Sequence, residues 1–449
     1  MAITLQITDG TDTVDFNDGS NLYLAEAFQM NIGDGAVSEL VISGWLPAID
    51  TDAKAVITKK FNRLIRKAIQ HYSERRIDRA VWLVWKPDDQ TDTQYCKVMG
   101  GGEIEVVNHT IGGLRGGRFA PSIIREGAWR SVAPDGTAGT AIHTAQTIYN
   151  KSDADGDNWL DIASTRTNDA PALLTFTSDI TSGTLPDKIV IATKTGDDTT
   201  FLNKFNPHFN AVDLTNNGGG SQVADTSAAG NFRLELTATG TPYWTIADTD
   251  LVAYSGNYNV YCAAWLNSGV TGAGRFRFQT EYITGEWKDV SGSSVTNLIY
   301  LGNFNIPGVD YNPFVTMATS SDLQIKLDYE EVTAGADTYL WGMFLVPTDI
   351  PPFEGDFDII STDEIVVDGV NQLVYVTDAS GNQKIATGAA GGNVARGRYP
   401  RAIGGQVNRY FFYYWGDPSS GYLTIYDPNL TIAIDLVTVD RFLGLRGNT

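Results

Sequence analysis

The chain has 449 residues, of which 42% are hydrophobic, 11% aromatic and only 19% charged, and it contains 46 glycines. This composition is typical of a folded protein with many turns, and it favours a mostly β fold of roughly two to four domains over a disordered chain. The formal net charge of -21 argues against nucleic acid as the main partner, because phosphate binding is supplied chiefly by Lys and Arg.

The cysteines and the N-terminus bear on the compartment in which the chain is made. Cys96 and Cys262 stand in segments assigned to different domains, so no disulfide framework is expected. The first ten residues, MAITLQITDG, alternate like a strand and lack the basic and apolar regions of a signal peptide. We therefore expect a protein made in a cytoplasm, with no membrane partner and no cofactor.

The first section, residues 1–131, is predicted as a small β-domain carrying the one long helix of the chain. Short alternating segments around DGTDT and between residues 80 and 108 predict strands. Between them, apolar residues of Thr51–Arg79 recur at steps of three and four, which is the period of one helix face. Asp52 stands at the expected N-cap, and neither proline nor glycine interrupts the run.

This predicted helix is basic in an acidic chain. Nine Lys and Arg fall between Lys54 and Arg79, against two acids. Such a helix can contact nucleic acid, a membrane or an acidic protein, or it can simply present a solvated face over a packed stripe. The sharper hypothesis is a contact between copies of the chain, because a basic ridge would orient itself against acidic flanks. The candidate contact residues are Lys59, Lys60, Arg63, Arg66, Lys67, Arg75 and Arg76.

Two further sections are predicted from strand spacing and turn-rich boundaries. Residues 132–350 contain eight or more strand-like segments without a helical period, which favours a jelly-roll or other β-sandwich. Between Pro134 and Asp356, ten Lys and Arg stand against 27 Asp and Glu, so the negative charge is concentrated here. Residues 351–449 are predicted as a third, β-rich section that begins at the Pro351-Pro352 corner.

The segment KSDADGDNWLD resembles a calcium loop in its spacing. The candidate ligands are Asp153, Asp155, Asp157 and Asp161, because alternate residues of a tight loop can aim carboxylates at one Ca²⁺ ion. The glycine is displaced to Gly156, however, and Ser164 replaces the bidentate acid. A polar hairpin turn made of Asp, Gly and Asn, with calcium absent or weakly bound, is therefore the favoured interpretation of the segment.

No catalytic residues can be nominated from motifs, and the expectation is a protein that is not an enzyme. The four histidines show no metal-binding spacing, and no serine lies in a GxSxG elbow. The aromatic residues of the central sandwich are more informative, because sugar rings stack on exposed aromatic faces, although most such residues are core. The candidate glycan contacts are Trp244, Trp265, Trp287 and Tyr282.

Several phrases in this order resemble a known family. A small β-domain with one helix is followed by IIREGAWRSVAP, then by IYNKSDADGDNWLDIASTRTNDAPALLTFT opening a sandwich, and by YLWGMFLVPTD closing it. This organisation resembles tail-tip proteins of long-tailed bacteriophages, of the distal tail protein kind. The resemblance implies a virion structural protein of the tail or baseplate, whose first domain forms a ring, usually a hexamer, with other tail proteins as neighbours. It also implies that the sandwich faces outward for host attachment through surface glycans.

Two alternatives stay open. One is a secreted glycan-binding or glycan-cleaving protein with a jelly-roll module, since two carboxylates suffice for glycoside hydrolysis. The other is a calcium-dependent adhesin built on Asp153–Asp161. The third section is larger than the resemblance implies, and no duplicated ring domain is visible.

Overall fold

The computed structural model gives the protein a mostly β fold, which confirms the fold class predicted from composition and strand patterns. It describes residues 4–17, 23–24, 37–41, 44–47, 51–73, 81–86, 93–102, 107–111, 114–119, 122–126, 129–130, 140–154, 156–162, 169–177, 188–215, 220–266, 273–280, 283–290, 296–306, 322–335, 337–356, 364–369, 372–378, 380, 383–385, 395–415, 426, 428, 430–438 and 441–442.

The chain divides into two compact units. Unit 1 comprises Met1–Ala141, Asn168–Pro171 and Val437–Thr449, and unit 2 comprises Ile142–Thr167 and Ala172–Leu436. No helix among the described residues is long and apolar enough to cross a membrane.

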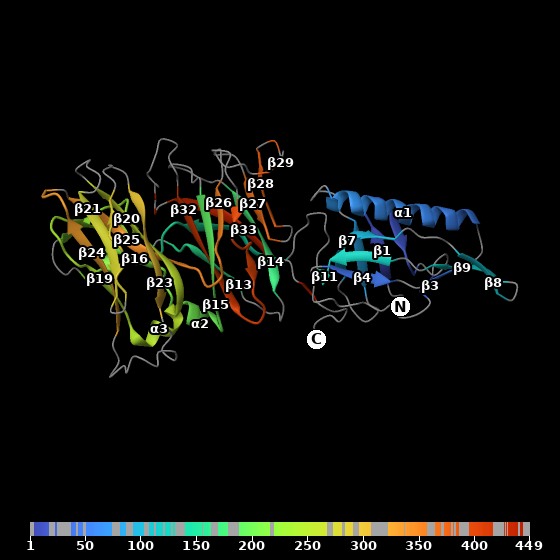
Figure 1. Ribbon diagram of the computed structural model, residues 1–449, viewed down its shortest axis with the longest axis horizontal. Helices are drawn as coiled ribbons and strands as arrows, with labels where there is room; N and C mark the ends of the chain where they lie inside the picture. The colour runs from blue at the N-terminus through green and yellow to red at the C-terminus, as the bar shows by residue number, and fades with distance from the viewer. Residues whose placement is uncertain are drawn as a thin grey trace. The chain divides into compact units, whose positions relative to one another are not determined.

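Unit 1 is a sheet with one helix laid on it (Figure 1). The sheet has the order β2-β1-β6-β7-β10-β4 and is antiparallel throughout this path. The strands are β1 (Thr4–Thr8), β2 (Thr13–Asp15), β4 (Val37–Val41), β6 (Trp82–Lys86), β7 (Gln94–Gly101) and β10 (Ser122–Glu126). A smaller sheet joins β3 (Tyr23–Leu24), β5 (Gly44–Pro47), β9 (Leu114–Phe119) and β8 (Val107–Ile111).

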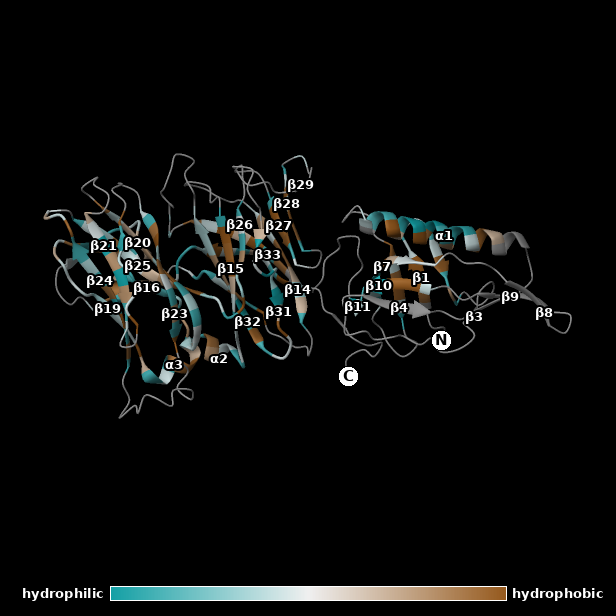
Figure 2. Cartoon of the chain, viewed as in Figure 1, coloured by the Kyte–Doolittle hydropathy of each residue, from teal (hydrophilic) through white to brown (hydrophobic). Residues whose placement is uncertain are grey.

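The helix α1 spans Thr51–Ser73, as its apolar period predicts, and the remainder of the predicted segment lies outside the described residues. Phe61, Leu64, Ile65 and Ala68 are buried, which is the i, i+3, i+4, i+7 pattern of one helix face. They share a core with strand residues such as Leu5. Figure 2 shows the hydrophobic side of α1 turned toward the sheet and its hydrophilic side turned away.

The end of the described chain returns to unit 1. Strand β11 (Trp129–Arg130) pairs with β34 (Arg441–Phe442), so the first and last parts of the chain share a sheet. Unit 2 is therefore an insertion between two neighbouring strands of unit 1.

Unit 2 contains two sandwiches, one inserted into the other. The first combines a sheet of order β12-β33-β14-β27-β28-β29 with one of order β13-β32-β15-β26-β30. Its strands are β12 (Thr140–Tyr149), β13 (Trp159–Ile162), β14 (Ala170–Thr177), β15 (Lys188–Gly196), β26 (Phe353–Asp356), β27 (Glu364–Asp368), β28 (Leu373–Thr377), β29 (Gln383–Ile385), β30 (Ala395–Arg396), β31 (Arg401–Ala402), β32 (Val407–Trp415) and β33 (Thr431–Thr438).

The inserted sandwich lies between β15 and β26 in sequence, although these two strands pair with each other. Its six-stranded sheet contains β16 (His208–Asn210), β17 (Gly220–Ala224), β18 (Phe232–Leu236), β20 (Gly256–Leu266), β23 (Asn297–Ile306) and β25 (Thr338–Pro347). Its four-stranded sheet has the order β19-β24-β21-β22, formed by β19 (Tyr243–Ile246), β21 (Gly274–Gln279), β22 (Lys288–Asp289) and β24 (Leu323–Glu331). Short helices α2 (Thr199–Leu202) and α3 (Leu251–Tyr254) and the 3-10 turns η1 (Ala211–Asp213), η2 (Ala229–Asn231) and η3 (Asp248–Asp250) connect the strands.

The structure thus divides the chain differently from the predicted sections 1–131, 132–350 and 351–449. Strands β26, β27 and β32 of the predicted third section pair with β15, β14 and β13 of the predicted second section. Only the inserted sandwich ends near residue 350. Antiparallel partners far apart in sequence leave no local signal, so a boundary drawn from linear spacing separates strands that share a sheet.

An aromatic layer joins the two sandwiches of unit 2. Phe344 of β25 stacks on Tyr413 of β32, with ring centroids 5.4 Å apart, and Tyr261 of β20 contacts Trp415. All four belong to or pack against one hydrophobic core. The face of β32 is therefore a packing surface rather than a binding surface.

Candidate functional site

The predicted contact residues on α1 have different environments. Lys59 and Arg66 are exposed and Lys60 is half-buried, whereas Arg63 and Lys67 form ion pairs with Asp12 and Asp9 of the β1–β2 hairpin. Arg75 and Arg76 lie outside the described residues. Part of the basic ridge is thus neutralised within unit 1, and its proposed role between subunits stays a prediction.

The predicted calcium ligands are held by protein partners. Asp153 forms a buried ion pair with Lys151 at 2.9 Å. Both carboxylate oxygens of Asp161 accept hydrogen bonds from Arg409, at 2.6 and 2.7 Å. Asp157 accepts a hydrogen bond from the Ser152 hydroxyl, and burial raises the pKa of its carboxyl.

Asp153 and Asp161 are thus paired with different cations, and Asp157 is held by a hydroxyl, so the three carboxylates have separate partners. Asp155 lies outside the described residues, and β13 follows the loop where a calcium hand has a helix. Among the described residues, no group of three or more His, Cys, Asp or Glu is placed to hold a metal. The local geometry is therefore that of an ion-paired turn.

The predicted glycan contacts divide into core and surface residues. Trp244 is buried, and its indole Nε1 donates to the backbone oxygen of Asn210 at 2.9 Å. It therefore belongs to the core of the inserted sandwich, which corrects its prediction as a glycan contact. Its position in β19 points it inward, since alternate residues of a strand face opposite sides. Tyr282 lies outside the described residues, while Trp265 and Trp287 are half-buried.

The surroundings of Trp287 form a polar platform, which we call the Trp287 face. In β21, Phe276 and Phe278 point into the core, so Arg275 and Arg277 point outward. Both guanidinium groups lie over the Trp287 ring, 5.0 and 4.4 Å from its centroid. Figure 1 shows the strands of this sheet on the side of the inserted sandwich away from β32.

Ion pairs with β24 fix the two arginines of the Trp287 face. Arg275 donates through Nε and one terminal nitrogen to Glu330, at 3.0 and 2.7 Å. Arg277 donates through Nε to Asp328 at 2.9 Å. The strand register places these pairs directly opposite each other across the sheet. The face thus presents one aromatic ring beside fixed donors and acceptors whose charges cancel.

Trp265 occupies a similar setting on the other sheet. Its ring lies 4.2 Å from that of Tyr339, and the Arg233 guanidinium sits over both rings, at 5.6 and 4.1 Å. Arg233 also pairs with Asp225 at 3.2 Å. This cluster provides a matched comparison for the Trp287 face.

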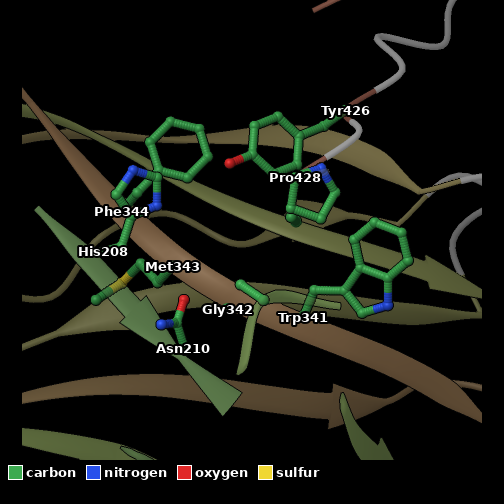
Figure 3. Close-up of a pocket in the computed structure, with 10 residues that line it drawn as sticks. His208, Asn210, Trp341, Gly342, Met343, Phe344, Tyr426 and Pro428 are labelled. Carbon is green, nitrogen blue, oxygen red and sulfur yellow. The ribbon is translucent and has the colours of Figure 1, made fainter. Parts of the chain in front are cut away.

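A small cavity lies elsewhere in unit 2 (Figure 3). It is lined by residues of β16, β20, β25 and η2 and by two residues of the segment before β33, namely His208, Asn210, Ala229, Ala263, Trp341, Gly342, Met343, Phe344, Tyr426 and Pro428. The space open to the centre of a water molecule is about 20 Å³. It therefore accommodates a single small group rather than a whole sugar ring.

Sequence reasoning missed the arginines of the Trp287 face and the cavity histidine. The alternation RFRF at residues 275–278, followed by Trp287, was a usable signal, because the inward phenylalanines require outward arginines. Nothing in the linear sequence marks His208, since its cavity is assembled from segments more than 200 residues apart.

Comparisons with known proteins give little similarity. No family model matches the chain, and no curated protein matches it. Among solved structures, an exo-β-1,3-galactanase from Phanerochaete chrysosporium, crystallised with β-1,3-galactotriose, has 7% sequence identity and a TM-score of 0.22. The match covers 74% of this chain and 58% of that chain.

This neighbour bears on one prediction. The expectation from sequence that the chain is not an enzyme is contradicted by a neighbour that is itself a galactanase, and the expectation is withdrawn. At a TM-score of 0.22 the likeness assigns no activity to this chain. None of these comparisons bears on the predicted phage-tail resemblance.

Proposed function

We propose that unit 2 binds neutral glycans through the Trp287 face. The observation that carries this proposal is the half-buried Trp287 ring on the outer side of the four-stranded sheet, with the Arg275 and Arg277 guanidinium groups over it. Each arginine is fixed by a carboxylate on the neighbouring strand. A flat aromatic surface with fixed polar groups around it is suited to a sugar, whose ring is apolar on one face and polar at its edge.

Charge supports a neutral ligand. The two arginines and two carboxylates of the face cancel, so the face offers both donors and acceptors to hydroxyl groups. The surrounding region, with ten cations against 27 acids between Pro134 and Asp356, repels anionic sugars. Binding of neutral glycans is accordingly expected to change little with salt.

Glycan-array binding and calorimetry test this proposal. Trp287→Ala should weaken binding of the best array ligand about tenfold or more, because it removes the stacking surface. Trp265→Ala is the matched control, since Trp265 is also half-buried and also contacts an arginine, but on the other sheet. Equal binding by wild type and Trp287→Ala, or selective loss in Trp265→Ala, would place the site elsewhere or remove it.

The same ligands should be tested for release of reducing ends. Release by wild type would make the glycan a substrate and favour the glycan-cleaving alternative. Binding without release would leave a glycan-binding module.

A second candidate is a ring-forming structural protein of a phage tail or baseplate, made in the host cytoplasm and carried in the virion. Two observations favour it. Unit 2 is inserted between β11 and β34 of unit 1, and the resemblance implies a sandwich that is either attached to the ring domain or inserted in it. On α1, Lys59 and Arg66 are exposed, as a contact between acidic copies would require.

Native mass measurement tests the ring. Wild type is expected to assemble, for example into hexamers, and Lys59→Glu/Arg66→Glu to shift the mass toward monomer. Lys204→Glu is the control, because Lys204 is an exposed cation of unit 2 outside the ridge. A monomeric wild type across micromolar concentrations would reject the ring.

A further inference from the structure

The cavity shown in Figure 3 has features of a built site rather than a packing gap. Its walls are aromatic at Trp341, Phe344 and Tyr426, and its polar groups come from His208 and Asn210. Tyr426 stacks on Phe344 at 5.3 Å and donates its hydroxyl to the Asn150 backbone oxygen, which holds this wall in place.

Irregularities of the backbone position the residues that line the cavity. The register of β20 against β25 shifts so that Ala263 pairs with Gly342 and Ala264 with Leu340, which leaves Trp341 as the extra residue of a bulge. Bulges re-aim side chains and are frequent beside functional sites. At Gly342 an added Cβ would lie 2.5 Å from the Phe209 oxygen, so glycine is needed for β16 to approach.

His208 is the unusual group. It is only 6% exposed, and its ring packs against those of Phe344 and Tyr413, with centroids 5.5 and 5.9 Å away. Burial lowers the pKa of its imidazole to about 3, although Asp153 opposes the shift, so the ring is neutral near pH 7. Its Nε2 has no hydrogen-bond partner among the described residues. An unpaired buried polar atom lacks the hydrogen bond that water gives it in the unfolded chain, so a ligand that pairs with it gains that interaction.

The size and charge of the site restrict the ligand. Only a group about as large as a water molecule fits beside a neutral imidazole, so carboxylates and ammonium groups are disfavoured. A hydroxyl fits, because it can donate or accept according to the imidazole tautomer. The half-buried Trp341 indole supplies an apolar surface for the rest of such a ligand.

We propose that this cavity, the His208 pocket, takes the hydroxyl of a hydroxymethyl arm of a neutral hexose whose ring packs on Trp341. The inference rests on the proposed glycan function and adds a second subsite with a preference for hexoses over pentoses. A site that hydrogen-bonds a hydroxyl discriminates against the analogue that lacks it.

Titrations with paired sugars test the His208 pocket. Glucose is compared with xylose, and galactose with L-arabinose, because each pentose matches its hexose without the hydroxymethyl arm. In the intact protein, NMR of the indole N–H signals is expected to show one hexose binding about tenfold more tightly than its pentose. His208→Phe should abolish this preference, and His208→Gln, which keeps a polar group, should retain part of it.

Controls separate this inference from the proposed function. His208→Phe should be at least as stable as wild type, because it removes an unpaired polar atom, and Trp287→Ala should retain the hexose preference. Equal affinities for hexose and pentose, no monosaccharide binding, or a preference unchanged in His208→Phe would overturn the His208 pocket. A hexose-soaked crystal with only an ordered water in the cavity would do the same. Loss of array binding in Trp287→Ala alongside any of these results would leave the proposed function intact.

Discussion

The cations on α1 and many of those in unit 2 have different environments. On α1 of unit 1, basic side chains lie mainly at the surface, and Arg63 remains 52% exposed in its ion pair. In unit 2, cations are few and are largely used inside the fold or on the Trp287 face, with Arg409 only 1% exposed. In an acidic chain, exposure therefore separates cations that hold the fold from cations that are available to partners.

This comparison predicts that the effect of removing a cation falls as its exposure rises. Four side chains span the range, namely Arg409, Lys194, Arg233 and Arg63. For each variant the quantity measured is the free energy of unfolding, by denaturant titration against wild type.

Removing Arg409 is expected to have the largest effect. Its guanidinium donates to both oxygens of Asp161, to the Leu202 backbone oxygen and to Asn203. Arg409→Met should destabilise unit 2 by about 3 kcal/mol, because it leaves a partly buried carboxylate without its partner. Arg409→Met/Asp161→Asn should recover part of this loss. A loss below about 1 kcal/mol in Arg409→Met would contradict the expectation that the effect of removing a cation falls as its exposure rises.

The contribution of Lys194 should appear in the pH dependence of the free energy of unfolding. Its Nζ donates to the Ser255 oxygen and the Tyr258 hydroxyl, and burial lowers its pKa to about 8 from 10.5. The unfolded chain therefore binds more protons between these values, so stability should rise with pH from about 8, by at most about 1.4 kcal/mol per pH unit.

Lys194→Met is the reference for this slope, and the useful window ends near pH 9.5. Above this pH, tyrosines ionise in the unfolded chain, whereas burial raises the pKa of folded-state tyrosines such as Tyr258. The folded protein is therefore destabilised relative to the unfolded chain. Identical pH profiles for wild type and Lys194→Met would show that the lysine is not buried as described.

Arg233 lies between the extremes. Its side chain is 24% exposed, pairs with Asp225 and lies over the Tyr339 ring. Arg233→Met should cost about 1 kcal/mol, because it loses a partly screened ion pair and a cation–π contact. Asp225→Asn should cost less, since it leaves the ring contact in place.

Arg63 should have the smallest effect. At 52% exposure its pair with Asp12 is screened by solvent, so Arg63→Met should change stability by less than about 0.5 kcal/mol. A loss comparable to that of Arg409→Met would mean that the α1 ridge is structural, which would weaken its assignment to subunit contacts.

Much of unit 1 could be predicted because its signals are local. The apolar period of α1 predicted one packed helix face, and Phe61, Leu64, Ile65 and Ala68 of that period are buried, whereas Val56 and Ile69 are exposed. The tryptophans predicted as glycan contacts lie in different environments. Trp244 and Trp265 look equivalent in sequence, yet only Trp244 points into the core, because strand register decides which residues face inward.

The candidate sites were less accessible to sequence analysis. The arginines beside Trp287 follow from the alternation of β21, but their carboxylate partners on β24 depend on a pairing across about 50 residues. The calcium prediction relied on spacing alone. It could not anticipate that Arg409, 248 residues after Asp161, would occupy that carboxylate.

The sequence by itself determined the mostly β fold, the one long amphipathic helix and the concentration of acids in the middle of the chain. These properties depend on composition and on periods of two and 3.6 residues, which local backbone geometry imposes. Only the tertiary structure decided the nesting of the two sandwiches, the partners of the ionised residues and the cavity around His208. Those features arise from pairing and packing between distant segments, for which a linear pattern carries no register.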